Sequence, residues 1–136
     1  MIDTSRWAPY AGSLLRIMTG LLYLSHGLQK LFDFPAPPDR LPPPGLVAIV
    51  FVASILELVG GALIAVGFYT RIVAFILSGE MAVAYFMIFA PNGFFPILNG
   101  GLLTIMYCFV YFYFAFAGGG PVSVDNLIRK SPPAAV

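Results

Sequence analysis

Charged residues are scarce in this chain. Only 10% of its 136 residues are Asp, Glu, Lys or Arg, while 60% are hydrophobic. A soluble domain typically has about 25% charged residues, and a small domain leaves a large share of its surface exposed after folding. The sequence has too little polar material to cover that surface. Lipid is therefore expected to cover it, which makes the bilayer the first predicted partner.

Residues for metal binding and thiol chemistry are also scarce. The chain has one cysteine, Cys108, and one histidine, His26. A single cysteine excludes an intrachain disulfide and a cysteine-ligated cluster, and the pair is too small a set for a zinc site. The formal net charge of +1 gives no basic footprint for nucleic acid. We expect no metal site, no covalently bound cofactor and no nucleic-acid partner.

Four long apolar segments account for most of the chain. They cover residues 11–32, 45–68, 72–90 and 97–117, and each is close to the ~20 residues that a helix needs to cross a bilayer. None alternates polar and apolar residues as a membrane strand would, and proline or glycine falls between them. The sequence predicts a single all-α domain over 1–136. Its architecture would be a membrane-spanning antiparallel four-helix bundle, with residues 118–136 as a tail.

Basic residues indicate the orientation of this bundle. Four crossings put both termini on one side, together with Arg6, Arg71, Arg129 and Lys130, and with Arg16 just inside. Lys30 and Arg40 fall on the other side. Because cytoplasmic loops are enriched in Lys and Arg, both termini and the tail are predicted to be cytoplasmic.

Several ionisable residues interrupt the apolar segments, and such residues suggest function because they are costly in a membrane. Counted from the cytoplasmic end at ~1.5 Å per residue, their depths predict a pair between Arg16 and Glu80. The depths also predict a pair between Glu57 and either His26 or Glu80. Lys30 lies near the outer interface and is expected to extend toward it. The candidate buried polar cluster consists of Arg16, Tyr23, His26, Glu57 and Glu80.

Residue spacing supports a shared face for this cluster. Arg16, Thr19, Tyr23, His26 and Lys30 follow a 3-4-3-4 rhythm, which places them on one stripe of a helix. On the second segment, Gly60 and Gly61 allow another helix to approach closely. On the fourth segment, polar side chains can reach the same interior: Asn99, Thr104, Tyr107 and Tyr111. A purely structural reading stays open, because buried ion pairs also fix helix register without any chemistry.

Five stretches together resemble the DoxX family of small bacterial membrane proteins. They are "LLYLSHGLQKLF", "ELVGGALIAVGFYTR", "GEMAVAYF", "FFPILNGG" and "GGGPVSVD", in the family's order. The resemblance implies a multi-pass, four-helix protein of the bacterial inner membrane. The family's name comes from a subunit of a thiosulfate:quinone oxidoreductase. One departure concerns Leu102, because the family pattern usually has an acid after the asparagine and two glycines. Its absence suggests that a polar site is altered or lost in this chain.

The resemblance and the polar cluster lead to two main hypotheses. The first is an integral membrane subunit of a redox-associated complex that contributes to a quinone site. In it His26, Glu57 and Tyr107 contact the quinone and a partner protein supplies electrons, which favours an accessory membrane subunit over an enzyme on its own. The alternative is a non-catalytic structural or assembly subunit of another membrane complex, and a homo-oligomer stays open in both. A third idea, a solute or proton pathway, would be favoured by broken helices, and the sequence shows none.

Overall fold

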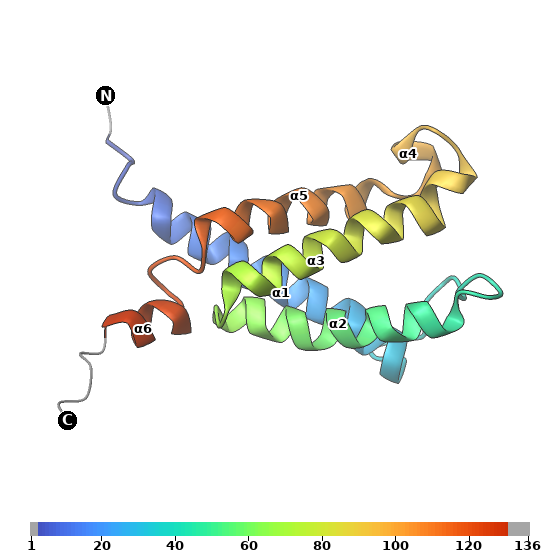
Figure 1. Ribbon diagram of the computed structural model, residues 1–136, viewed down its shortest axis with the longest axis horizontal. Helices are drawn as coiled ribbons and strands as arrows, with labels where there is room; N and C mark the ends of the chain where they lie inside the picture. The colour runs from blue at the N-terminus through green and yellow to red at the C-terminus, as the bar shows by residue number, and fades with distance from the viewer. Residues whose placement is uncertain (1–2, 131–136) are drawn as a thin grey trace.

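The computed structural model describes residues 3–130, which form six α-helices and contain no β-strand (Figure 1). The all-α prediction is therefore confirmed for this part of the chain. The helices and two shorter turns are α1 (Ala8–Phe32), α2 (Val47–Val66), α3 (Thr70–Ala84), η1 (Tyr85–Phe89), η2 (Ala90–Asn92), α4 (Pro96–Asn99), α5 (Leu102–Ala117) and α6 (Val124–Lys130).

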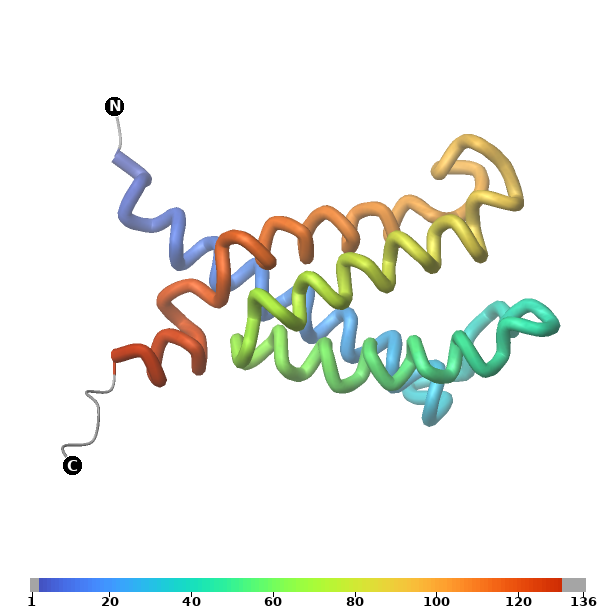
Figure 2. The backbone as a smooth tube through the Cα atoms, in the orientation of Figure 1, coloured from blue at the N-terminus to red at the C-terminus, as the bar shows by residue number. Residues whose placement is uncertain are grey.

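The four long helices pack side by side in an order that follows the chain. Helix α1 packs along α2, α3 packs along α5, and α2 also contacts α3. The start of α1 and the short helix α6 lie at one end of the molecule, and the α1–α2 loop and α4 lie at the other (Figure 2). One end of the molecule therefore gathers α6, the α2–α3 turn and the loop after α5.

Glycines bring α1 and α2 into backbone contact. A Cβ added at Gly61 would lie 2.5 Å from the backbone nitrogen of Leu24, and one at Gly20 would lie 2.5 Å from the backbone nitrogen of Ala65. Gly60 instead faces α3, where an added Cβ would lie 2.7 Å from a methyl of Leu77. The predicted close approach at Gly60 and Gly61 is confirmed. Gly61 lies against α1, and Gly60 lies against α3.

The distribution of polar and apolar residues between interior and surface differs from that of a soluble protein. The buried positions include Ser13, Arg16, Ser54, Glu57, Thr70 and Ser78. The outward faces carry large apolar side chains, such as Phe75 at 64%, Phe109 at 67% and Phe116 at 67% exposure. Soluble monomers rarely expose continuous apolar surface of this kind. These outer faces have the character expected of helices in lipid.

Two helical segments are long and apolar enough to cross a membrane, Val47–Val66 and Thr70–Asn92. The second continues α3 through a π-helical turn at Tyr85–Phe89 and a 3₁₀ turn. Helix α5 is also apolar but only 16 residues long. Helix α1 has 25 residues and is interrupted by Arg16, His26 and Lys30. The predicted segment 97–117 is therefore not one continuous helix.

The break in that segment lies at Gly100 and Gly101, and it corrects the expectation that no helix is broken. Gly100 has a left-handed backbone, with φ of 85°, which ends α4 after one turn. The Asn99 side chain accepts a hydrogen bond of 2.8 Å from the Gly101 backbone N–H and so stabilises the break. Asn99 also donates to the Gly93 carbonyl at 2.9 Å. Hydropathy does not reveal the break, because the residues on both sides of it are largely apolar.

The predicted tail 118–136 is in part structured. The loop after α5 turns back toward the α2–α3 turn, and α6 follows it. The remaining tail positions, 131–136, lie outside the described residues.

Candidate functional site

The buried face of α1 organises the interior of the molecule. Its buried residues are Ser13, Arg16, Gly20, Tyr23 and Gly27. Arg16 and Tyr23 lie on this buried stripe as predicted, but its other positions are Ser13, Gly20 and Gly27 rather than Thr19, His26 and Lys30. His26 and Thr19 are half-buried beside it. The small residues let α2 lie close to α1. Long side chains of α1 such as Arg16 can therefore reach acceptors on α2.

Tyr23 joins α1 to α3. Its side chain is 1% exposed, and its hydroxyl donates a hydrogen bond of 3.0 Å to Oε2 of Glu80. Sequence reasoning placed both residues in one cluster, and the structure brings them together. The Glu80 carboxyl is therefore held from one side by a neutral donor in the core.

Glu57 is paired with Lys30 rather than with the predicted partners. The Lys30 Nζ lies 2.7 Å from Oε1 of Glu57, whose side chain is only 4% exposed, against 32% for that of Lys30. The predicted pairs of Glu57 with His26 or Glu80 are wrong, and Lys30, for which no partner was predicted, takes their place. Lys30 lies one turn beyond His26 on the same helix, and its flexible stem reaches back into the interior.

Arg16 has a structural role that sequence depth did not reveal. It is fully buried, and its guanidinium donates to the backbone carbonyls of Gly119, Ala65, Ile64 and Val122. The predicted Arg16–Glu80 pair is wrong. The last carbonyls of α2 have no partners within the helix and carry partial negative charge. They attract the guanidinium, which also ties the loop after α5 to α1.

Aromatic rings from α1 and α5 fill the centre beside the two carboxyls. Tyr23 packs edge-on against Tyr107 and Tyr111, with ring centroids 5.2 and 5.0 Å apart. Tyr111 donates to the Thr19 carbonyl at 3.0 Å. His26 contacts Tyr107 edge-on at 6.0 Å and shows no side-chain hydrogen bond to residues 3–130. The expectation that Tyr107 and Tyr111 reach the interior is confirmed.

Two carboxylate oxygens in this interior have no partner within residues 3–130. They are Oε2 of Glu57 and Oε1 of Glu80, and both atoms are buried. A buried acceptor without a partner is costly and rare in native structures. The two oxygens therefore mark the places where a further hydrogen-bond donor would be stabilised.

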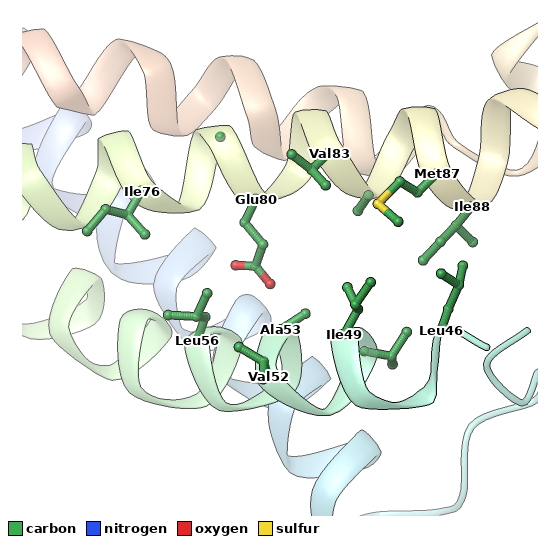
Figure 3. A pocket seen from close by; sticks show the side chains of 13 residues that line it. Leu46, Ile49, Val52, Ala53, Leu56, Ile76, Glu80, Val83, Met87 and Ile88 are labelled. Carbon is green, nitrogen blue, oxygen red and sulfur yellow. The ribbon is translucent and has the colours of Figure 1, made fainter.

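Glu80 lies at an apolar groove between α2 and α3. The groove has a volume of about 270 Å³. Figure 3 shows the Glu80 carboxyl pointing from α3 toward α2, between side chains such as Leu56 and Ala53. Glu80 is the one ionisable residue among those that line the groove. Three predicted contact residues, His26, Glu57 and Tyr107, do not line it.

Asp125 holds the opposite end of α3 in place, and sequence reasoning missed it. Its two carboxylate oxygens accept hydrogen bonds of 2.8 and 2.9 Å from the backbone N–H groups of Tyr69 and Thr70. Partial burial favours the neutral acid, but the hydrogen bonds from Thr70 and Tyr69 outweigh it and hold the pKa of Asp125 below its ordinary value. The sequence offered one signal. The residue before α3 is Tyr69, which cannot cap the helix with its own side chain, so an acceptor from elsewhere in the chain was needed.

Within residues 3–130, no group of three or more His, Cys, Asp and Glu side chains is placed to hold a metal ion. Beside the apolar groove the structure places one carboxyl group, that of Glu80, whose Oε1 has no partner within residues 3–130.

Apolar outer faces around a buried polar interior define a helical membrane protein. A sequence profile of the DoxX family matches residues 12–90. An uncharacterized protein of Haemophilus influenzae is 38% identical over 135 residues, which cover 96% of this chain and 99% of that relative. No solved structure matches the chain. The chain belongs to the DoxX family, as its five stretches indicated.

Proposed function

We propose that the chain is a multi-pass subunit of the bacterial inner membrane, with both termini in the cytoplasm. In this arrangement α1, α2, α3 with its π-helical extension, and α5 with α4 cross the bilayer as an antiparallel four-helix bundle. Apolar side chains on the outer faces of all four helices support it. So do Arg71, Arg129 and Lys130, which belong to the end of the molecule that carries α6.

Within the membrane, we propose that the subunit serves a redox-associated complex and contributes a quinone site. The observation that carries this proposal is the unpartnered Oε1 of Glu80 beside the apolar groove between α2 and α3. A volume of about 270 Å³ is near the small end of ligand pockets. It suits a single ring whose isoprenoid tail continues into lipid.

The residues of this chain would act as follows. When bound, a quinone supplies two-electron, two-proton chemistry. Oε1 of Glu80 accepts a hydrogen bond from a hydroxyl of the reduced form, while Tyr23 keeps Oε2 occupied. The quinone contact that we propose is therefore Glu80, in place of His26, Glu57 and Tyr107, which do not line the groove. With one histidine and one cysteine in the sequence, electron transfer is assigned to a partner redox protein.

A photoreactive quinone analogue tests this site in lipid nanodiscs. Gly79 lines the groove, and a Cβ added there meets nothing within 4 Å, so Gly79→Phe is the variant chosen to fill the groove. Gly12→Phe is the matched control, because Gly12 also has open space around it and lies outside the groove.

We expect wild type and Gly12→Phe to be labelled, Gly79→Phe to lose the label, and Glu80→Gln to be labelled more weakly. The amide of glutamine presents a donor where the proposal needs an acceptor. Equal labelling of wild type and Gly79→Phe would refute the groove as the quinone site.

A second candidate function is a structural or assembly subunit without ligand chemistry. Arg16 and the Lys30–Glu57 pair favour it, because both are used to hold helices together. Leu102, which stands where the family pattern has an acid, begins α5 and is 50% exposed. Under this function wild type takes up no quinone probe, while Lys30→Met lowers recovery of a co-purifying membrane complex.

A further inference from the structure

A second cavity lies at the end of the molecule opposite α4. It has a volume of about 630 Å³ and is formed by the start of α3, the loop after α5 and helix α6. Its position is distinct from the groove that contains Glu80, because the two cavities share no lining residue. The quinone proposal makes no use of it.

The charges around this cavity are unbalanced. Arg71, Arg129 and Lys130 line it, together with one acid, Asp125. Asp125 already accepts two backbone hydrogen bonds at the start of α3. The three basic side chains show no hydrogen bond or ion pair to any residue in the range 3–130. The cavity therefore has two more positive than negative side chains and several free N–H donors.

One wall of the cavity is backbone rather than side chain. Gly118 and Gly120 have left-handed conformations, with φ of 79° and 75°, which other residues rarely adopt. A Cβ at Gly118 would lie 3.2 Å from Nε of Arg71. Glycine at this position lets the Arg71 guanidinium lie directly against the loop, at the edge of the cavity.

We propose that this cavity binds the phosphate headgroup of an anionic phospholipid in the cytoplasmic leaflet. Free N–H groups of Arg and Lys match phosphate oxygens, and basic pockets between helices on the cytoplasmic side bind such headgroups. Two cavity-lining residues with large exposed side chains, Tyr69 at 61% and Ile72 at 62% exposure, offer apolar surface for the acyl chains. The inference rests on the proposed membrane orientation and not on the quinone role.

Lipid retention measured by native mass spectrometry tests the proposal. The protein is taken from nanodiscs that contain phosphatidylcholine with either phosphatidylglycerol or cardiolipin. The test variant is Arg71→Gln/Arg129→Gln/Lys130→Gln, whose changed side chains have no hydrogen-bonded partners in residues 3–130. Arg40→Gln is the control, because Arg40 belongs to the α1–α2 loop at the opposite end.

We expect wild type and Arg40→Gln to retain the anionic lipid over phosphatidylcholine by about tenfold or more, and the triple variant to lose this preference. Equal retention of anionic and zwitterionic lipid by wild type would overturn the proposal. So would an unchanged preference in the triple variant.

A further arm adds inorganic phosphate at millimolar concentration. Displacement of the lipid by phosphate at that level would assign the cavity to free phosphate and overturn the lipid assignment. Gly79→Phe separates this proposal from the quinone site, because it should lose the quinone label and keep the lipid.

Discussion

Arg16→Met removes the charged group that joins α1 to the end of α2 and to the loop after α5. In wild type, the guanidinium donates to carbonyls at the end of α2 and in the loop after α5. The Ile64 carbonyl also accepts from the Gly67 N–H at 3.1 Å, so it keeps one partner in the variant. The carbonyls of Gly119, Ala65 and Val122 lose the partner that the structure shows for them.

Each abandoned buried carbonyl costs about 1–3 kcal/mol. Because the site lies near one end of the helices, water can reach part of it, and we take the lower end of that range for each group. The expected loss is about 3–5 kcal/mol in the free energy of unfolding. That loss lowers the melting temperature by about 10 °C or more. Arg16→Lys should fall between wild type and Arg16→Met, since one ammonium cannot reach all of these carbonyls.

The chain's single cysteine provides the assay. Cys108 is half-buried, with its Sγ 3.6 Å from Oγ of Ser78. A maleimide dye that fluoresces on reaction with a thiol therefore reports unfolding during a thermal scan in detergent. Leu15→Met is the control, because Leu15 neighbours Arg16 and is 46% exposed. A melting temperature for Arg16→Met within about 2 °C of that control would refute the role assigned to Arg16.

Three further predictions are checked by thermal unfolding, the first two with the same dye and the third by circular dichroism, because a maleimide needs a thiolate that is absent at acid pH. Gly61→Leu should fold poorly or melt far below wild type, because its Cβ would lie 2.5 Å from the backbone of α1, whereas Gly79→Leu faces open space and should melt near wild type. Lys30→Met should cost about 2 kcal/mol or more by leaving a buried carboxylate unpaired, and adding Glu57→Leu should recover part of that loss; no recovery would argue against the pair. Asp125 has a lowered pKa, so its contribution to stability is fully present above the ordinary aspartate pKa and is lost as the pH falls through the lower folded value. Asp125→Asn should remove that dependence, and an identical acid profile in the variant would contradict it.

The long helices could be predicted from the sequence because hydropathy is local information. The segment 45–68 was expected to be helical, and α2 covers Val47–Val66. The break at Gly100 could not be seen in the same way. It depends on hydrogen bonds from Asn99 to the Gly93 carbonyl and from the Gly101 N–H to Asn99, and a sliding average of hydropathy does not register them.

The candidate site was partly predictable for a related reason. Helical spacing placed Tyr23 on the buried face of α1, and its hydroxyl does reach Glu80. Depth alone then misassigned the partners of Arg16 and Glu57. An estimate of depth gives only the height of the Cα atom. Arginine and lysine side chains extend by about a helical turn from that height and bind acceptors at other levels.

The sequence by itself determined that this protein is helical, has apolar helices of membrane character and belongs to the DoxX family, because these properties follow from composition, periodicity and short motifs. Only the tertiary structure decided which charges meet. Gly20 and Gly61 bring α1 against α2, and that contact sets the positions from which Lys30 reaches Glu57 and Arg16 reaches the end of α2. The packing also leaves Oε1 of Glu80 unpartnered beside an apolar groove. Pairing in a buried interior depends on distances of a few ångströms between helices, and those distances are fixed by packing rather than by order along the chain.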